Sequence, residues 1–181
     1  VVEDTTEALG QLAHMNRELL NGPLIAITGS SGKTSVKEMI VSILGQESRV
    51  HATQGNLNNH IGVPLTLLAM QADTDVAVIE MGASAIGEIA YLCDIARPDV
   101  TLVNNIQHAH IEGFGSIEGV ATAKSEIYKG LKPSGTAVIN LDLAWSDAWL
   151  SEFSDKQCLT FSTEHNNADV IAENIGNNCS A

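Results

Sequence analysis

The stretch from Pro23 to Thr34 reads PLIAITGSSGKT, an aliphatic run followed by a glycine-rich loop. The run 24–28 has the composition of a buried strand, and Gly29 interrupts it. Beyond the loop, apolar residues recur at helical spacing at Val36, Met39, Ile40, Ile43 and Leu44. These positions share one helix face, and Gly45 is placed to end the helix. The stretch therefore predicts a strand, a glycine loop and a helix, in that order.

This order of elements is typical of a phosphate-binding loop. A helix N-terminus directs free N–H groups and the positive end of its dipole at the loop, Lys33 can reach the β- and γ-phosphates of ATP, and the Thr34 hydroxyl can ligate Mg²⁺. The candidate ATP-binding residues are Gly29, Ser30, Ser31, Gly32, Lys33, Thr34 and Ser35. The general pattern G-x-x-x-x-G-K-[ST] requires glycine where this chain has Ile27, so the loop is a T-G-x-x-G-K-T variant. A chance turn before a helix is the alternative, and the flanking strand and helix argue against it.

Strand and helix patterns alternate along the rest of the chain. Strands are predicted at 24–28, 49–52, 76–80, 100–104, 136–140, 158–162 and 169–175, and helices at 4–20, 34–44, 61–70, 85–95, 116–131 and 143–151. Such alternation predicts an α/β fold of the P-loop NTPase kind, a mostly parallel sheet flanked by helices. We expect residues 1–21 to be a helix and linker and residues 22–181 an ATP-binding domain. Because residues 176–181 supply no closing element, we expect this domain to be incomplete at its C-terminal end.

Composition and charge exclude several classes of function. The 181 residues are 44% hydrophobic and carry a formal net charge of −13, which disfavours nucleic acid and anionic membranes as partners. The three cysteines, Cys93, Cys158 and Cys179, form no CxxC pattern and are expected to be free thiols. No apolar run approaches the ~20 residues of a membrane span, and Glu3 and Asp4 stand where a signal peptide needs basic charge. We therefore expect a cytoplasmic protein that does not insert into a membrane.

Polar residues follow several of the predicted strands, at the edge where parallel sheets bind ligands. Glu80 ends the run 76–80 and is either a solvent-facing carboxylate or a Mg²⁺ ligand opposite Thr34. The run 100–103 leads into NNIQHAH, and either His108 or His110 is a candidate site residue. The loop 54–60, here called the asparagine loop, contains Asn56, Asn58 and Asn59. Its amides either form a turn or bind a sugar or phosphate.

Lys124 lies within an apolar helical stripe. The stripe consists of Val120, Ala123, Ile127, Tyr128 and Leu131. Two interpretations remain open from the residues alone. Lys124 either extends from the edge of the stripe into water or is an inward-facing amine available for chemistry or ligand contact.

The segments 28–39 (TGSSGKTSVKEM), 55–59 (GNLNN), 78–83 (VIEMGA), 104–105 (NN), 110–116 (HIEGFGS) and 123–127 (AKSEI) together resemble the Mur ligase family, whose members add amino acids to the peptidoglycan precursor. The resemblance extends from about residue 1 to residue 175. It implies that this chain is the central ATP-binding domain of a protein with a UDP-binding domain before it and a closing domain after it. It also implies that this fragment by itself is inactive.

The resemblance further implies roles for individual residues. Thr34 and Glu80 match ligands of the Mg²⁺ that lies between the β- and γ-phosphates, and His110, rather than His108, matches a ligand of a second Mg²⁺. Lys124 matches a lysine that CO₂ carbamylates, which turns the amine into a carboxylate-like group beside that metal. Lys33, Glu80, His110 and Lys124 are accordingly the expected catalytic residues. Asn56, Asn58 and Asn59 match a segment that contacts the UDP-sugar-peptide substrate.

The implied activity is an ATP-dependent, ADP-forming ligase reaction of peptidoglycan precursor synthesis. The family member most similar in these motifs joins D-alanyl-D-alanine to UDP-N-acetylmuramoyl-tripeptide through an acyl phosphate, so these small molecules are the expected partners, and we expect a monomer. Alternatives are another Mur or folylpolyglutamate-type ligase, a P-loop ATPase or switch without ligase activity, and an inactive scaffold.

Overall fold

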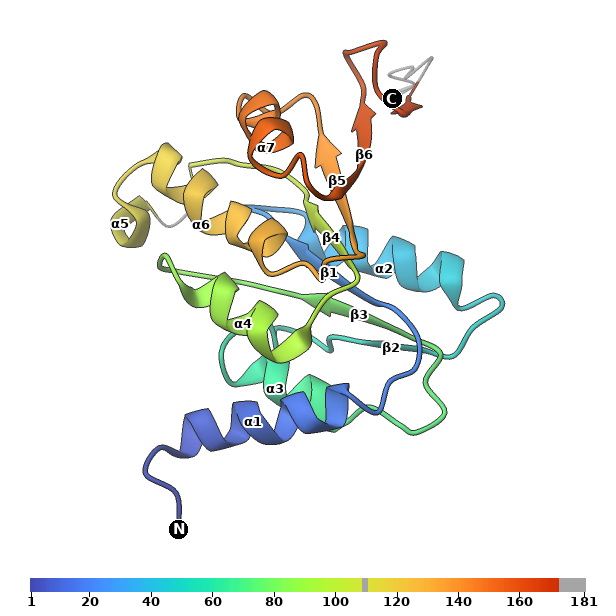
Figure 1. The fold of residues 1–181 in the computed structure, drawn as a ribbon, viewed down its shortest axis with the longest axis vertical. Helices are drawn as coiled ribbons and strands as arrows, with labels where there is room; N and C mark the ends of the chain where they lie inside the picture. Colours follow the sequence, from blue (N-terminus) through green and yellow to red (C-terminus); the bar gives the residue numbers. More distant parts are fainter. Residues whose placement is uncertain (109–110, 173–181) are drawn as a thin grey trace, which may run out of the picture.

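The computed structural model describes residues 1–108 and 111–172, in which strands and helices alternate (Figure 1). The strands are β1 (Leu24–Thr28), β2 (Val50–Ala52), β3 (Val76–Glu80), β4 (Val100–Val103), β5 (Thr136–Asn140), β6 (Gln157–Ser162) and β7 (Val170–Ile171). The helices are α1 (Thr5–Arg17), α2 (Lys33–Leu44), α3 (Gly62–Leu68), α4 (Glu88–Ala96), α5 (Ile111–Phe114), α6 (Ile117–Lys129) and α7 (Ser146–Glu152). Each predicted element is present with slightly shifted ends, and α5 is an additional short helix. Residues 173–175 of the last predicted strand lie outside the described residues.

The strands form a 7-stranded parallel sheet in the order β2-β3-β1-β4-β5-β6-β7. This confirms the predicted α/β fold with a parallel sheet. From β1 the chain runs out to the β2 edge, returns through β3, and then crosses to β4 on the other side of β1. Open parallel sheets bind ligands where the strand order reverses in this way, at the carboxyl ends of the strands. The loop that follows β1 therefore lies at the expected ligand position of this architecture.

Helices cover both faces of the sheet (Figure 1). On one face α2 packs over a small apolar cluster that includes Ile27 and Val78. On the opposite face α4, α6 and α7 cover a larger core that includes Ala26 and Ile79, and α1 packs outside α3 and α4. Ala26 and Ile27 belong to different clusters because successive strand side chains point to opposite faces. Most of the core thus lies on one side of the sheet.

The apolar face of α2 differs from the predicted one. Met39 and Ile43 are 62% and 65% exposed, whereas Ile40, Val41 and Leu44 pack against the sheet. The buried arc of α2 is centred between Ile40 and Leu44, and at 100° per residue Met39 and Ile43 fall beyond its edge. The predicted helix is therefore correct, and the sheet covers only part of its predicted apolar face, which leaves Met39 and Ile43 exposed.

Arg17 fastens α1 to the rest of the domain. Its side chain is 2% exposed, its Nε donates to the Ala96 carbonyl at 2.7 Å, and an Nη donates to the Asp99 carboxylate at 2.8 Å. The Asp99 carboxylate also accepts hydrogen bonds from the Leu24 N–H and from Lys132 Nζ, both at 2.9 Å. A buried guanidinium is stable only when its donors are satisfied in this way. Arg17 therefore ties α1 to the end of α4 and to the start of β1.

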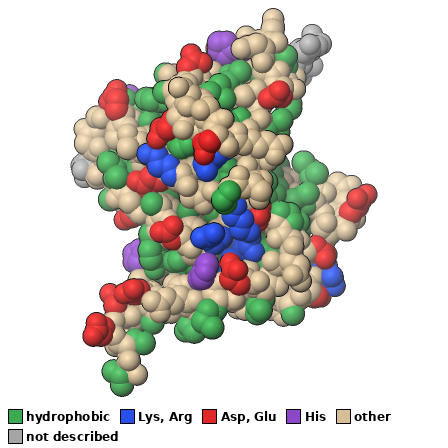
Figure 2. Space-filling model, in the orientation of Figure 1, with side chains coloured by type: hydrophobic (Ala, Val, Ile, Leu, Met, Phe, Trp, Pro, Cys, Tyr) green, Lys and Arg blue, Asp and Glu red, His purple; other side chains and the backbone are tan. Residues whose placement is uncertain are grey.

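The surface agrees with the acidic composition. Figure 2 shows acidic side chains spread over one face among apolar and neutral groups, with basic side chains in small groups. Within residues 1–108 and 111–172, no helix is both long enough and apolar enough to cross a membrane.

Candidate active site

The glycine loop joins the end of β1 to the start of α2 at the reversal of the strand order. Gly29 has φ +154° and Gly32, the N-cap of α2, has φ +69°, both in the region that favours glycine. The first hydrogen bond of α2 runs from the Val36 N–H to the Gly32 carbonyl at 3.0 Å. The N–H groups of Lys33, Thr34 and Ser35 therefore precede the helical ladder and point out of the helix end, where they favour an anion.

The other side of the loop is held by residues after β4. The Ser30 N–H donates to the Asn105 carbonyl at 3.1 Å, and the Ser31 N–H donates to Asn105 Oδ1 at 2.9 Å. Asn104 Nδ2 donates to the Ser31 carbonyl at 2.8 Å. The N–H groups of Ser30 and Ser31 would thus have to break their hydrogen bonds to Asn105 before they could donate to a phosphate. From the sequence, Asn104 and Asn105 stood out only through the family resemblance.

The Glu80 carboxylate lies beside the phosphate loop. It is the last residue of β3 and is 2% exposed, and its Oε2 accepts a hydrogen bond from Thr34 Oγ1 at 2.8 Å. Its Oε1 accepts a hydrogen bond from Asn58 Nδ2, also at 2.8 Å. The solvent-facing alternative for Glu80 is therefore wrong, because the side chain points inward between the two loops. The pairing gives a hydroxyl and a carboxylate within reach of one small cation.

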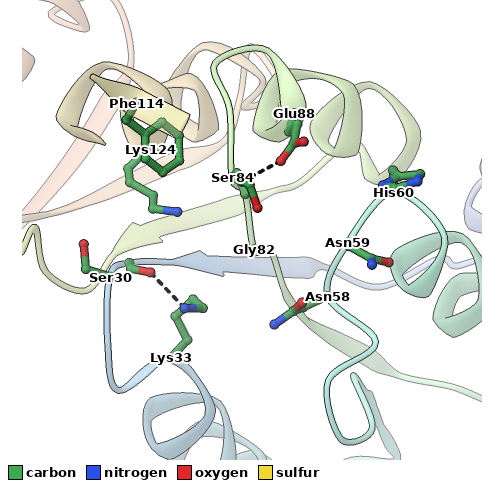
Figure 3. Close-up of a pocket in the computed structure, with 12 residues that line it drawn as sticks. Ser30, Lys33, Asn58, Asn59, His60, Gly82, Ser84, Glu88, Phe114 and Lys124 are labelled. Carbon is green, nitrogen blue, oxygen red and sulfur yellow. Dashed lines mark hydrogen bonds between the residues drawn. The ribbon is translucent and has the colours of Figure 1, made fainter. Parts of the chain in front are cut away.

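A cavity of about 350 Å³ opens beside these residues (Figure 3). Of the predicted site residues, its lining includes Gly29, Ser30, Lys33, Asn58, Asn59 and Lys124. His60, Ser84, Glu88 and Phe114 also line it and were not predicted. His60 is the last residue of the asparagine loop, and Phe114 lies in the segment 110–116 that carries the family resemblance. Ser84 and Glu88 follow the β3 exit, so extending the segment 78–83 along the chain would have found them. The structure thus joins segments that are far apart in the sequence.

Lys124 points into this cavity from α6, and Lys33 reaches toward it from the phosphate loop (Figure 3). Lys124 is 3% exposed, and its Nζ lies 5.5 Å from the centroid of the Phe114 ring. Burial and, second, the positive charge of Lys33 lower the pKa of Lys124 to about 8, although Glu88 and Glu126 oppose the shift. The structure therefore favours the inward-facing interpretation. Two amines at one cavity make it suitable for anions.

The predicted residues of the asparagine loop differ in their placement. Asn58 lines the cavity and holds Glu80. Asn59 also lines it, but its Oδ1 accepts the N–H groups of Ile61 and Gly62 at 3.1 and 2.8 Å. Asn56 is exposed and is not part of the lining. The amides of Asn58 and Asn59 thus have partners within the protein, a detail that the clustering of asparagines could not reveal.

Two further predictions concern histidines and metals. His110 lies outside the described residues, and His108 is exposed and does not line the cavity. In the part of the chain that the structure describes, no group of three or more His, Cys, Asp or Glu side chains is placed to hold a metal. Mg²⁺ does not need such a cage, because it keeps several waters and takes few carboxylates together with substrate phosphates. The hard oxygens of Thr34 and Glu80 fit Mg²⁺ on this basis.

Known proteins share this architecture. Residues 27–180 match the family model described as the Mur ligase middle domain. UDP-N-acetylmuramoyl-tripeptide–D-alanyl-D-alanine ligase of Escherichia coli (strain K12) is 47% identical over 175 residues, which cover 97% of this chain and 39% of that protein. The crystal structure of MurF from Acinetobacter baumannii has a TM-score of 0.92 and 40% identity, over 97% of this chain and 38% of that one. MurF ligase from Thermotoga maritima, solved in complex with ADP, has a TM-score of 0.81 and 35% identity, over 91% and 38%.

The chain spans less than two fifths of the length of these relatives. The family model, in contrast, matches most of this chain, from the end of β1 onward. The match includes the glycine loop, the asparagine loop, Glu80 and Lys124. The chain therefore belongs to the Mur ligase family, and residues 27–180 correspond to its middle domain.

Proposed function

We propose that the protein containing this chain is an ATP-dependent ligase that joins D-alanyl-D-alanine to UDP-N-acetylmuramoyl-tripeptide in peptidoglycan precursor synthesis. The observation that carries the proposal is the meeting of three segments at one cavity. The phosphate loop contributes Lys33, and α6 contributes Lys124. The asparagine loop contributes Asn58, whose side chain donates a hydrogen bond to Glu80 of β3. The relatives described above are named for this reaction, and one neighbour was solved in complex with ADP.

The phosphate loop is the proposed ATP site. The N–H groups of Lys33, Thr34 and Ser35 would donate hydrogen bonds to phosphate oxygens at the α2 N-terminus. In the structure Lys33 Nζ donates to the Gly29 carbonyl at 2.9 Å, so the ammonium already lies over the loop that would hold the phosphates. Thr34 and Glu80 would hold one Mg²⁺, which when bound supplies positive charge that screens the phosphates. His110 and a carbamylated Lys124 are proposed ligands of a second Mg²⁺.

The lowered pKa of Lys124 supports the proposed carbamate. An amine must be neutral to attack CO₂, and at a pKa of about 8 a substantial fraction is neutral near physiological pH. In the attack, the neutral nitrogen bonds to the carbon of CO₂, one C=O π electron pair moves onto oxygen, and one N–H proton is lost to water. The product is anionic, and the nearby ammonium of Lys33 would stabilise it. Lys124 would thereby change from a cation into an oxygen ligand at the same position.

In the proposed reaction the terminal carboxylate of the tripeptide attacks the γ-phosphorus of ATP. An acyl–phosphate bond forms as the β–γ bond breaks and ADP leaves. The amine of D-alanyl-D-alanine then attacks the acyl carbon, loses a proton and expels inorganic phosphate. Two anions, carboxylate and phosphate, must approach each other, so the cationic groups at this cavity serve to reduce their repulsion.

The acceptor would enter beside the asparagine loop. We propose that Asn58, Asn59 and, at the rim, Asn56 face the UDP-sugar-peptide, since the first two line the cavity. We also propose a monomer in the cytoplasm, where ATP is supplied. Cys93 and Cys158 form no disulfide among the described residues, which is compatible with a reducing compartment.

The test is ADP release by the full-length protein, with each candidate UDP-muramoyl peptide and each amine supplied in turn. We expect ADP only when UDP-N-acetylmuramoyl-tripeptide and D-alanyl-D-alanine are both present, and loss of this activity in Lys33→Ala. ADP release that is indifferent to both substrates would indicate an ATPase or switch. Turnover with another acceptor and amine would indicate a different ligase, and an unaffected Lys33→Ala variant would indicate a scaffold. The chain of residues 1–181 by itself is expected to show no ligation.

A further inference from the structure

Both oxygens of the Glu80 carboxylate are held, and by different loops. Oε2 accepts from Thr34 Oγ1 of the phosphate loop, and Oε1 accepts from Asn58 Nδ2 of the asparagine loop, each at 2.8 Å. The carboxylate is 2% exposed, so water supplies little of its hydrogen bonding. Its direction is therefore set by these two contacts. Thr34 is itself a proposed ligand of the metal. Asn58 is therefore the partner of the Glu80 carboxylate that lies outside both the phosphate loop and β3.

Asn58 itself is fixed against β3. Its carbonyl accepts the Gly82 N–H at 2.7 Å. A Cβ added at Gly82 would lie 3.0 Å from Asn58 Oδ1, so the absence of a side chain there makes room for the amide. The amide orientation also follows from chemistry, because an ionised Glu80 carboxylate only accepts hydrogen bonds and so faces Nδ2. Asn58 can thus donate to Glu80 from a defined position.

The backbone of Glu80 is connected to the same loop. The Glu80 N–H donates to Thr53 Oγ1 at 2.9 Å, and the Thr53 carbonyl accepts from Lys37 Nζ at 2.6 Å. Lys37 is on α2 and is 2% exposed. The segment that leads from β2 into the asparagine loop is therefore anchored to the phosphate-loop helix. Asn58 and Glu80 therefore belong to one hydrogen-bonded network.

We propose that Asn58 is a positioning residue for the metal-bound nucleotide. By donating to Oε1, it holds the Glu80 carboxylate in the orientation in which Oε2 faces Thr34, so that one Mg²⁺ can meet both oxygens. This role differs from acceptor contact, and it rests on the proposed function in that Thr34 and Glu80 hold Mg²⁺. Loss of a hydrogen bond to a buried charged group is expected to weaken Mg²⁺-dependent binding roughly tenfold.

The test is calorimetric titration of the full-length protein with ADP, in EDTA and over a series of Mg²⁺ concentrations. The variant is Asn58→Leu, which keeps the approximate volume and removes the donor. The matched control is Asn166→Leu, the same substitution at an exposed position outside the cavity lining. For each protein, the quantity compared is the factor by which Mg²⁺ tightens ADP binding.

We expect this factor to fall roughly tenfold in Asn58→Leu, with the ADP dissociation constant in EDTA unchanged, and to be unchanged in Asn166→Leu. The same factor in Asn58→Leu and the wild type would overturn the proposal, as would an equal fall in both variants. If Asn58→Leu also loses ADP binding in EDTA, Asn58→Ser replaces it, because a serine hydroxyl is too short to reach Glu80. The factor by which Mg²⁺ tightens ADP binding is then expected to fall in Asn58→Ser, and an unchanged factor would overturn the proposal. If Mg²⁺ does not tighten ADP binding in the wild type, the proposed Mg²⁺ site at Thr34 and Glu80 is itself wrong, and the Asn58 proposal is overturned with it.

Discussion

The amine of Lys124 is expected to react as a neutral nucleophile far below the pH at which ordinary lysines do. With a pKa of about 8, roughly half of the Lys124 side chains are neutral at pH 8. An exposed lysine with a pKa of about 10.4 is then neutral in roughly 0.4% of molecules, about a hundredfold less. A short peptide that carries one ordinary exposed lysine, added to each sample, provides the reference.

The assay is modification by cyanate, a small reagent that attacks neutral amines, followed by mass spectrometry of the peptides. The ratio of Lys124 modification to modification of the reference peptide in each sample cancels the pH dependence of the reagent. Between pH 7 and pH 9 the neutral fraction of Lys124 rises roughly tenfold and levels off, while that of the reference lysine, with a pKa of about 10.4, rises roughly a hundredfold. The ratio should therefore fall about tenfold over this range. A ratio that stays constant with pH would refute the assigned environment of Lys124.

The cause of the shift is also testable. Because the charge of Lys33 is the second contribution after burial, Lys33→Met is expected to move the Lys124 midpoint to higher pH.

The lowered pKa of Lys124 also makes the stability of the fold depend on pH. The unfolded chain binds more protons than the folded one between pH 8 and pH 10.5, so the folded state becomes more stable as the pH rises through this window. At pH 7 the lowered pKa of Lys124 costs the folded state at most roughly 3 kcal/mol of stability. Lys124→Met removes this cost, so the variant should be more stable than the wild type at pH 7 while ligation is abolished. A destabilised Lys124→Met variant at pH 7 would contradict this account.

Three other substitutions test the fold and the loop. Arg17→Met should lower the free energy of unfolding by about 3 kcal/mol in urea melts. Arg49→Met, which removes an ion pair whose arginine side chain is 62% exposed, should lower it much less, and equal losses would contradict the buried role of Arg17. Thr34→Val should leave ADP binding in EDTA intact but remove most of its tightening by Mg²⁺, measured by calorimetry, and unchanged tightening would exclude Thr34 as a ligand. Gly32→Ala forces a residue with φ +69° into the left-handed region, and should weaken ADP binding and cost at least about 1 kcal/mol of stability.

The sequence by itself determined the order of strands and helices, the glycine loop and the parallel sheet. These features depend on local patterns: aliphatic runs bounded by glycine, helical spacing, and a motif whose residues are contiguous. The positions of Thr34 and Glu80 near each other also followed from one general rule, that the carboxyl ends of parallel strands meet at one edge. Roles for His110 and for a carbamylated Lys124 came only from family resemblance.

The tertiary structure decided what depends on contacts between distant segments. Lys124 could face water or the core until its 3% exposure and its place at the cavity were known. Met39 and Ile43 had the right spacing for a buried helix face, but the rotation of α2 on the sheet leaves them exposed. The hydrogen bond from Asn58 to Glu80 joins residues 22 positions apart. Spacing along the chain fixes which residues share an element, whereas the packing of elements fixes which side chains meet, and the chemistry of this site depends on the latter.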